Sequence, residues 1–218
     1  MTRRHEVLAE MGLAPVWRLR NQPEAVVPAK AGTQWMEIKE AVPACTACGL
    51  HKTRTQTVFG VGDENADWML IGEAPGAEED RLGEPFVGQA GKLLDNMLAA
   101  IDLKRGENVY IANVLKCRPP GNRNPEPDEV AKCTPFLKTQ IALIQPKLII
   151  AMGRFAAQTL LSSDATIASL RGKVYRYEGV PLIVTYHPAA LLRNPAWKRP
   201  TWEDVQLARR ILDHASGA

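Results

Sequence analysis

Four short apolar runs between residues 68 and 186 have the length of buried strands, and longer segments with helical periodicity separate them. Because strands that alternate with helices form right-handed crossovers, we expect a parallel sheet with helices on both faces. A small hairpin or edge segment is expected at residues 174–181. The expected strands are residues 68–72, 109–115, 147–152 and 181–186, and the expected helices are residues 91–101, 126–144, 154–162 and 201–214.

The first 34 residues differ in character from the rest of the chain. Residues 22–33 are rich in alanine and proline, which is typical of a linker. The preceding residues 7–20 form a short apolar cluster that is too small to bury itself, so it docks either on the main domain or on another protein. We expect residues 1–34 to be an N-terminal extension and linker that can dock on a protein partner, and residues 35–218 to form one domain.

The composition fits one cytoplasmic domain. The 218 residues are 45% hydrophobic, which suffices for a core, and the net charge of +3 is only a weak indication of a partner. No apolar run approaches the roughly 18 residues of a membrane span, and the opening residues lead into no signal-like segment. We therefore expect a cytoplasmic protein without contact to a membrane and without structural disulfides, and monomeric by default.

Basic residues gather in two places along the chain. Such clusters either bind nucleic-acid phosphates or are solvated surface, and charge alone does not decide between these interpretations. The first cluster contains Lys116, Arg118 and Arg123, and the second contains Arg193, Lys198 and Arg199.

The loop at residues 72–91 carries the most informative pattern in the chain. It follows an apolar strand and precedes a helix, which is where open α/β sheets hold ligands. Its carboxylates would repel a phosphate, and neither the dinucleotide-binding glycine pattern nor the Walker ending is present. We therefore expect a site for a small neutral ring, with Phe86 as a stacking surface and Glu73 or Glu79 as a polar partner.

The four cysteines have a spacing that suits a metal centre. Cys45 and Cys48 are separated by two residues, so both thiolates can face one metal. Cys117 ends an expected strand and Cys133 lies on the next helix, so both can return to the same point. Four thiolates suit tetrahedral zinc or an iron–sulfur cluster, and four unrelated buried thiols are the alternative. We favour a shared centre that clamps the segment before the first strand onto the sheet.

Two further polar residues lie at the expected carboxyl edge of the sheet. Asn113 lies in an apolar strand, and its amide offers a donor and an acceptor that match a pyrimidine edge, although loop backbone would satisfy it equally well. His187 follows the last expected strand and is a candidate catalytic or substrate-contacting group, with a structural role as the alternative. The nearby Leu191 and Leu192 either insert between stacked bases or pack in a core.

Taken together, these motifs resemble the family 4 uracil-DNA glycosylases, the iron–sulfur type of bacteria and archaea. The resemblance covers residues 35–214 and implies an α/β/α fold around a four-stranded parallel sheet. It also implies a [4Fe-4S] cluster on all four cysteines, Cys45, Cys48, Cys117 and Cys133. The matching segments are Cys45-x-x-Cys48, Gly72–Gly76, Gly83–Gly91, Asn113–Pro120, Cys133 and His187–Arg193.

The resemblance implies a DNA repair enzyme that acts on uracil-containing DNA. Such an enzyme rotates uracil out of the duplex, hydrolyses its N-glycosidic bond and leaves an abasic site. By motif position, the flipped uracil would stack on Phe86 and Asn113 would read the pyrimidine edge. His187 would hydrogen-bond uracil O2 while negative charge develops on the leaving base.

The remaining roles follow from the same motifs. Glu73 would position water or stabilise the sugar cation, and Glu79 would help to reject thymine by crowding its methyl group. Gly72 and Ala74 belong to the same substrate-binding motif. One of two leucines, Leu191 or Leu192, is expected to fill the gap that the uracil leaves in the DNA. The residues expected to bind DNA phosphates are Arg118, Arg123 and Arg193.

Other activities compete with this interpretation. A related group that traps uracil covalently has Gly-Glu-Gln-Pro-Gly and a reactive histidine in a basic insertion. This chain has Ala74 and no histidine in residues 121–127, so we expect turnover rather than trapping. A non-catalytic DNA-binding protein would bind normal and uracil-containing DNA alike. A zinc-dependent hydrolase or deaminase would need His/Cys-x-Glu combined with Cys-x-x-Cys, and the chain lacks that combination.

Overall fold

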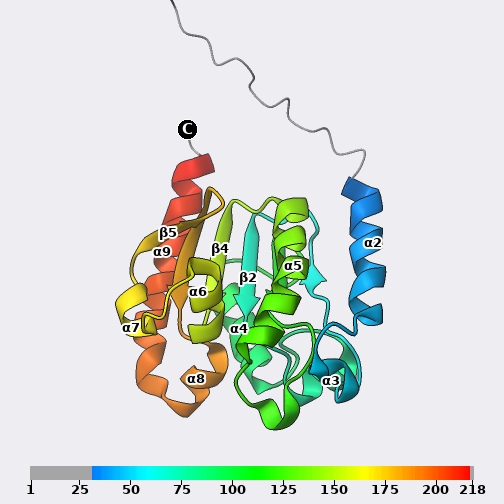
Figure 1. Ribbon diagram of the computed structural model, residues 1–218. Coiled ribbons are helices and arrows are strands. Elements are labelled where there is room, and N and C mark those ends of the chain that lie inside the picture. The colour runs from blue at the N-terminus through cyan, green and yellow to red at the C-terminus, as the bar shows by residue number, and fades with distance from the viewer. Residues whose placement is uncertain (1–30, 217–218) are drawn as a thin grey trace, which may run out of the picture. The chain divides into compact units, whose positions relative to one another are not determined.

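The structure is a computed structural model that describes residues 31–216 (Figure 1). The apolar segment at residues 7–20 and most of the predicted linker lie outside this range. The first described helix, α2 (Ala31–Ala44), begins before the predicted end of the linker at residue 33. The docking of the N-terminal extension on a protein partner therefore stays a prediction.

The described part of the chain contains one sheet of six strands, in the order β1-β3-β2-β4-β6-β5. The four central strands are parallel, as the apolar runs predict, and β1 and β5 pair antiparallel at the two edges. The four-stranded sheet implied by the resemblance is therefore the parallel centre of a larger mixed sheet. The strands are β1 (Val61–Gly62), β2 (Trp68–Gly72), β3 (Val109–Asn113), β4 (Leu148–Met152), β5 (Val174–Tyr177) and β6 (Val180–Thr185).

The edge strands differ from the central ones in sequence. β1 has only two residues, one of them glycine, so it has no apolar run to reveal it. β5 alternates exposed and half-buried residues and turns into β6 through Glu178 and Gly179. Their φ values of 47° and 89° are both positive, as the tight type I′ hairpin turn requires. The predicted hairpin at residues 174–181 is confirmed.

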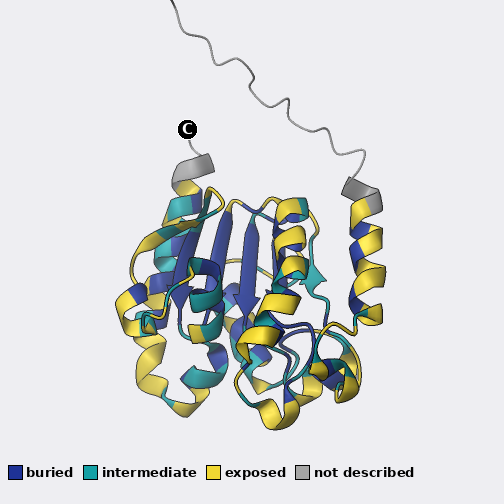
Figure 2. Ribbon diagram, in the orientation of Figure 1, coloured by how far each residue is buried: buried dark blue, intermediate teal, exposed yellow. Residues whose placement is uncertain are grey.

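Helices cover both faces of the sheet, which confirms the three-layer α/β/α prediction (Figures 1 and 2). Met69 and Ile71 pack with α5 and α6 on one face, while Trp68 and Leu70 pack with α4 and α9 on the other. Within residues 31–216, no helix has the length and apolar character needed to cross a membrane. Besides α2, the helices are α3 (Ala77–Leu82), α4 (Gln89–Ala99), α5 (Pro127–Ile144), α6 (Arg154–Leu161), α7 (Ile167–Leu170), α8 (Pro188–Arg193) and α9 (Lys198–Ser216), with short 3-10 turns η2 (Gly49–Lys52), η3 (Pro120–Asn122) and η4 (Pro195–Trp197).

The topology creates a crevice at the carboxyl ends of β2 and β3. These strands are neighbours, but α4 follows β2 on one face of the sheet and α5 follows β3 on the opposite face. Open α/β sheets bind their ligands at the carboxyl ends of the strands, beside the point where the strand order reverses, which here lies between β2 and β4. Glu73 directly follows β2 and Asn113 ends β3, so both lie at this crevice.

Candidate active site

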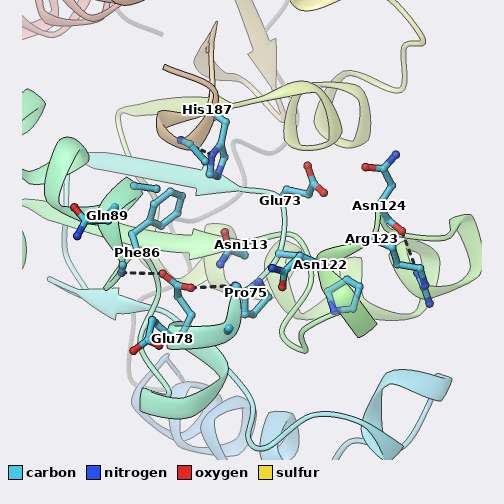
Figure 3. A pocket seen from close by; sticks show the side chains of 18 of the residues that line it. Glu73, Pro75, Glu78, Phe86, Gln89, Asn113, Asn122, Arg123, Asn124 and His187 are labelled. Atoms are coloured by element: carbon cyan, nitrogen blue, oxygen red, sulfur yellow. Dashed lines mark hydrogen bonds between the residues drawn. The ribbon is translucent and has the colours of Figure 1, made fainter. Parts of the chain in front are cut away.

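A cavity of about 490 Å³ lies at the carboxyl ends of β2, β3 and β6 (Figure 3). Its wall combines side chains from loops that are far apart in the sequence. The structure thus brings into one pocket the side chains that the sequence predicts to converge. The predicted site residues on this wall are Glu73, Ala74, Glu79, Phe86, Asn113 and His187, together with Arg123 and Arg193.

Gly72 shapes the pocket because it has no side chain. It pairs with Asn113 in the β2–β3 ladder. A Cβ atom on Gly72 would lie 2.4 Å from Asn113 Oδ1 and 2.6 Å from Phe86 Cζ. Since both distances are far shorter than a van der Waals contact, the Phe86 ring and the Asn113 amide can approach each other only over a glycine.

The peptide group after Phe86 is held from both sides. Phe86 has a φ of 56°, in the left-handed region that costs a residue other than glycine about 1–2 kcal/mol. Arg105 donates hydrogen bonds to the carbonyl oxygens of Phe86 and Pro85, at 2.8 and 2.7 Å. The N–H group of Val87 donates to Glu79 Oε1 at 3.0 Å. These contacts fix the backbone that orients the Phe86 ring.

Glu79 anchors the loop through its carboxylate. Oε1 accepts hydrogen bonds from the backbone N–H groups of Val87 and Gly88, at 3.0 and 3.1 Å. Oε2 accepts one from Gly76 N–H at 3.1 Å. Because hydrogen bonds to a charged acceptor are the stronger ones, this carboxylate ties the start of α3 to the segment that carries Phe86. Its role in rejecting the thymine methyl group stays a prediction.

His187 lies against Phe86 as an uncharged ring. The two ring centroids are 5.2 Å apart and the planes are inclined by 27°. Burial lowers the pKa of His187 to about 4, and the charge of Arg193 acts in the same direction. His187 Nδ1 accepts a hydrogen bond from Ala189 N–H at 3.1 Å, so in the neutral imidazole the proton lies on Nε2. The ring therefore retains one N–H donor.

Asn113 holds a buried acceptor that no donor within residues 31–216 satisfies. The residue is 2% exposed, and Oδ1 has no hydrogen-bond partner in this part of the chain. Leaving such an atom unpaired costs about 1–3 kcal/mol, so a ligand that donates to it would recover this energy. The backbone of Asn113 is fixed, because its carbonyl oxygen accepts a hydrogen bond from Lys116 Nζ at 2.9 Å.

Glu73 contributes a half-buried carboxylate to the cavity wall. Burial raises its pKa above the ordinary value, and the nearby charge of Arg154 opposes this shift. Its carbonyl oxygen accepts a hydrogen bond from Leu115 N–H at 3.0 Å, which continues the contact between the chains leaving β2 and β3. A raised pKa makes a carboxylate a better proton acceptor.

The two predicted wedge residues differ in exposure. Leu191 is 1% exposed and packs below the surface, whereas Leu192 is 47% exposed. A side chain must reach the surface to enter a base stack. Leu192 is therefore the residue of this pair that can contact DNA, and the assignment of Leu191 to DNA contact is corrected to core packing.

The predicted phosphate-binding arginines have different partners. Arg123 binds both carboxylate oxygens of Glu129, at 2.9 and 2.6 Å. Arg118 Nε donates to Asn122 Oδ1 at 2.7 Å. Arg193 is exposed and lies on the cavity wall. Phosphate binding by these residues stays a prediction, and Arg193 has the most accessible side chain.

All four cysteines line a second, small cavity at the ends of α2 and β3. Arg54 Nη1 donates to Cys117 Sγ at 3.0 Å, and Lys116 N–H donates to Cys133 Sγ at 3.2 Å. Burial raises the pKa of Cys117, and it raises that of Cys133 to about 11. In the described part of the chain, no three His, Cys, Asp or Glu side chains are arranged to hold a single metal ion. The predicted convergence of the four thiols is nevertheless confirmed.

Several residues at or near the cavity have no role predicted from the sequence. Gln89, Asn122 and Asn124 add polar side chains to the wall (Figure 3). Arg105 reaches the carbonyl oxygen of Phe86 from a position 19 residues further along the chain. Asn122 has a φ of 56°, and an asparagine between glycine and arginine in a proline-rich loop could have signalled such a turn. Nothing in the sequence pattern links Arg105 to Phe86.

The fold and the two cavities define an α/β/α protein with a pocket lined by aromatic and polar side chains at the carboxyl edge of its sheet. Comparison with protein families agrees with this class. The model of the Uracil DNA glycosylase superfamily matches residues 59–207. The chain belongs to this superfamily.

Individual relatives cover most of the chain. A type-4 uracil-DNA glycosylase of Archaeoglobus fulgidus is 51% identical over 167 residues, which are 73% of this chain and 83% of the relative. A type-4 uracil-DNA glycosylase of Sulfurisphaera tokodaii is 44% identical over 80% of this chain and 83% of its own length. One of Thermotoga maritima is 42% identical over 80% of this chain and 93% of its own length.

Proposed function

We propose that this protein is a DNA repair enzyme that releases uracil from DNA by hydrolysing its N-glycosidic bond, leaving an abasic site. The observation that carries the proposal is the meeting of Phe86, Asn113 and His187 around one cavity, with an acceptor on Asn113 that lacks a donor within residues 31–216. The similarity to relatives named type-4 uracil-DNA glycosylases supports it independently. Because the target atom is unreachable inside a duplex, the nucleotide is extruded into the cavity first.

Recognition of uracil follows from the unpaired acceptor. Uracil presents an N3–H donor between two carbonyl oxygens, and Asn113 Oδ1 accepts from that donor while the amide N–H₂ can reach the adjacent carbonyl. Cytosine presents an acceptor at N3 and would leave Oδ1 unpaired. The Phe86–His187 separation of 5.2 Å leaves no room for a base between these rings, so uracil stacks on the part of Phe86 that faces the cavity.

The neutral His187 suits the departure of uracil. Cleavage of the glycosidic bond leaves negative charge on the base, and an N–H donor placed in a water-poor site stabilises that charge. With Nδ1 engaged by Ala189 N–H, the Nε2–H group is the donor available for uracil O2. Glu73 accepts a proton from the attacking water, or orients it, and its raised pKa supports this role.

The DNA strand is proposed to cross the rim of the cavity. Leu192 fills the space that the extruded nucleotide leaves, because it is the exposed leucine of α8. Arg193 contacts phosphate, and Arg118 and Arg123 contribute from the loop around η3. This strand is held chiefly through its phosphates, so affinity falls with rising salt concentration.

We further propose that the four cysteines bind a [4Fe-4S] cluster. The residues fit such a group, since all four thiols surround one cavity and two of the sulfur atoms receive hydrogen bonds from Arg54 and the Lys116 backbone. The pKa of Cys133, raised to about 11, opposes a free thiolate, and a cationic centre reverses that preference. The cluster supplies a structural link between the end of α2, β3 and α5 rather than a reacting group.

The remaining parts of the proposal concern the protein as a whole. They comprise a cytoplasmic location, a monomeric state and an N-terminal extension, residues 1–34, that binds a protein partner. They rest on the composition and on the apolar pattern of residues 7–20.

The function is tested by measuring free uracil released from oligonucleotides that contain uracil, thymine or cytosine at one position. We expect release of uracil alone. Asn113→Ala should lose at least about tenfold in rate, as loss of one good hydrogen bond to the base implies, while still binding the duplex. Asn96→Ala, which changes an exposed amide on α4, is the control. Equal binding of all DNAs without base release would instead establish the non-catalytic alternative.

The cluster is tested by metal analysis and absorbance of the protein purified without oxygen. We expect iron and sulfide and a broad absorbance near roughly 400 nm, typical of thiolate-bound iron. Cys133→Ala should lose iron. Stoichiometric zinc without iron in the wild-type protein would contradict the proposal.

A further inference from the structure

A tryptophan near the pocket is exposed although its ring stacks on another aromatic ring. Trp197 lies in η4 and is 37% exposed. Its indole stacks on the Tyr186 ring, with centroids 4.6 Å apart and planes inclined by only 11°. This contact fixes the orientation of the indole, and the exposed fraction leaves part of it accessible to a ligand.

The position of this pair relative to the cavity follows from the backbone. Tyr186 directly precedes His187, whose φ of −69° and ψ of 137° are extended. His187 and Arg193 line the cavity wall, whereas Tyr186 directly before His187 and Trp197 four residues after Arg193 are not among its lining residues. Because consecutive Cα atoms are about 3.8 Å apart, the backbone of Tyr186 lies beside the pocket, and the stacked pair extends from there.

The charge around Trp197 suits a nucleic acid. Residues 193–199 contain three basic residues and no acidic one. Lys198 and Arg199 follow Trp197 directly, and both are exposed. The side chain of Arg199 is 90% exposed, and its ion pair with Glu203 is long, at 3.6 Å. An exposed aromatic ring beside cations is the combination by which proteins bind single-stranded DNA, with bases stacked on the ring and phosphates at the cations.

We propose that Trp197, supported by Tyr186, is a stacking platform for a base next to the extruded uracil in the same DNA strand. This proposal rests on the proposed function, since it is the uracil pocket that places the strand here. Lys198 and Arg199 hold the phosphates of the stacked nucleotide. The basic surroundings favour a DNA strand over an apolar peptide as the occupant.

The test uses single-stranded DNA of about 15 nucleotides, longer than most sites of this type. It carries one 2′-fluoro-2′-deoxyuridine, whose fluorine slows cleavage, and the fluorescent base 2-aminopurine at successive neighbouring positions. Stacking on an aromatic ring quenches 2-aminopurine. With the full-length wild-type protein we expect quenching at one position beside the uracil. Trp197→Ala should lose that quenching and raise Kd by about five- to 150-fold, and Trp197→Phe should restore part of both.

Trp202→Ala is the matched control, because Trp202 is also exposed, at 40%, and has no stacking partner within residues 31–216. It should leave both readouts unchanged. Absence of quenching at every position in the wild-type complex would overturn the platform, even if Trp197→Ala failed to fold. So would a folded Trp197→Ala protein with wild-type affinity, or an equal loss in Trp202→Ala. Wild-type protein that stacks the neighbouring base but releases no uracil from ordinary DNA would instead refute the proposed function.

Discussion

Glu79 should affect both stability and base release, because its carboxylate holds the loop that positions Phe86. Its carboxylate accepts hydrogen bonds from three backbone N–H groups, those of Gly76, Val87 and Gly88. Hydrogen bonds to charged groups contribute about 1.5–3 kcal/mol each. Water can replace part of this at the half-buried carboxylate, so we expect Glu79→Ala to lose about 2–4 kcal/mol of unfolding free energy.

The same change should slow base release. Without Glu79, one side of the Phe86–Val87 peptide group is unsupported, and the φ of 56° at Phe86 is no longer enforced from both sides. A displacement of about 1 Å in a positioned group can cost about 100-fold in rate. We therefore expect uracil release to fall by about tenfold to 100-fold. Glu79→Gln retains one acceptor, a neutral amide oxygen, and should lie between the wild-type protein and Glu79→Ala.

The assay combines denaturant unfolding with single-turnover release of uracil under conditions where every variant is folded. Glu78→Ala is the control, because this neighbouring carboxylate is 57% exposed and its ion-pair partner in the described part of the chain is Arg81 on the same helix. Unchanged stability and unchanged release in Glu79→Ala would refute the anchoring role. Release of thymine at unchanged stability would instead support the role predicted from the sequence, rejection of the thymine methyl group.

Three further changes test the surroundings of the pocket. The pKa of His187 is lowered to about 4 from an ordinary 6.5, so the unfolded chain takes up the proton first and stability falls as pH drops from about 6.5 to about 4. In His187→Gln, the free energies of unfolding at pH 7 and pH 4.5 should therefore differ less than in the wild-type protein. An equal difference in both proteins would contradict the shift. Lys116→Met should cost about 1–3 kcal/mol of stability, because the buried Asn113 carbonyl oxygen and Gln140 Oε1 lose their donor. Lys104→Met is the control: the Lys104 side chain is 74% exposed, so this change should alter stability by less than about 0.5 kcal/mol. Arg105→Met should slow uracil release more than Arg105→Lys, because lysine can still donate to the Phe86 carbonyl oxygen; equal rates would exclude a positioning role for this side chain.

The central sheet could be predicted because its strands are buried on both faces. Continuous apolar runs such as Trp68–Ile71 and Leu148–Met152 have no other explanation in a chain of alternating elements. The helix α3 was not expected, because Ala77–Leu82 is short and highly charged and lies within a loop rich in glycine and proline. α2 was missed because its apolar residues are sparse and it follows the alanine-rich segment.

The site was predictable where its residues belong to the sheet edge. Glu73, Asn113 and His187 each follow or end a parallel strand, and the carboxyl ends of parallel strands meet at one edge. The contacts that position these groups were not predictable. Arg105 acts on a carbonyl oxygen 19 residues away, and such a contact depends on the tertiary structure alone. The exposure of Leu192 rather than Leu191 likewise follows from the rotation of α8.

The most direct measurement is a crystal structure of the protein with free uracil bound. The proposed mechanism places the base on the Phe86 face, with uracil N3 about 3 Å from Asn113 Oδ1 and O2 within hydrogen-bond distance of His187 Nε2. Uracil bound elsewhere, or bound here with its N3–H directed away from Asn113, would contradict it.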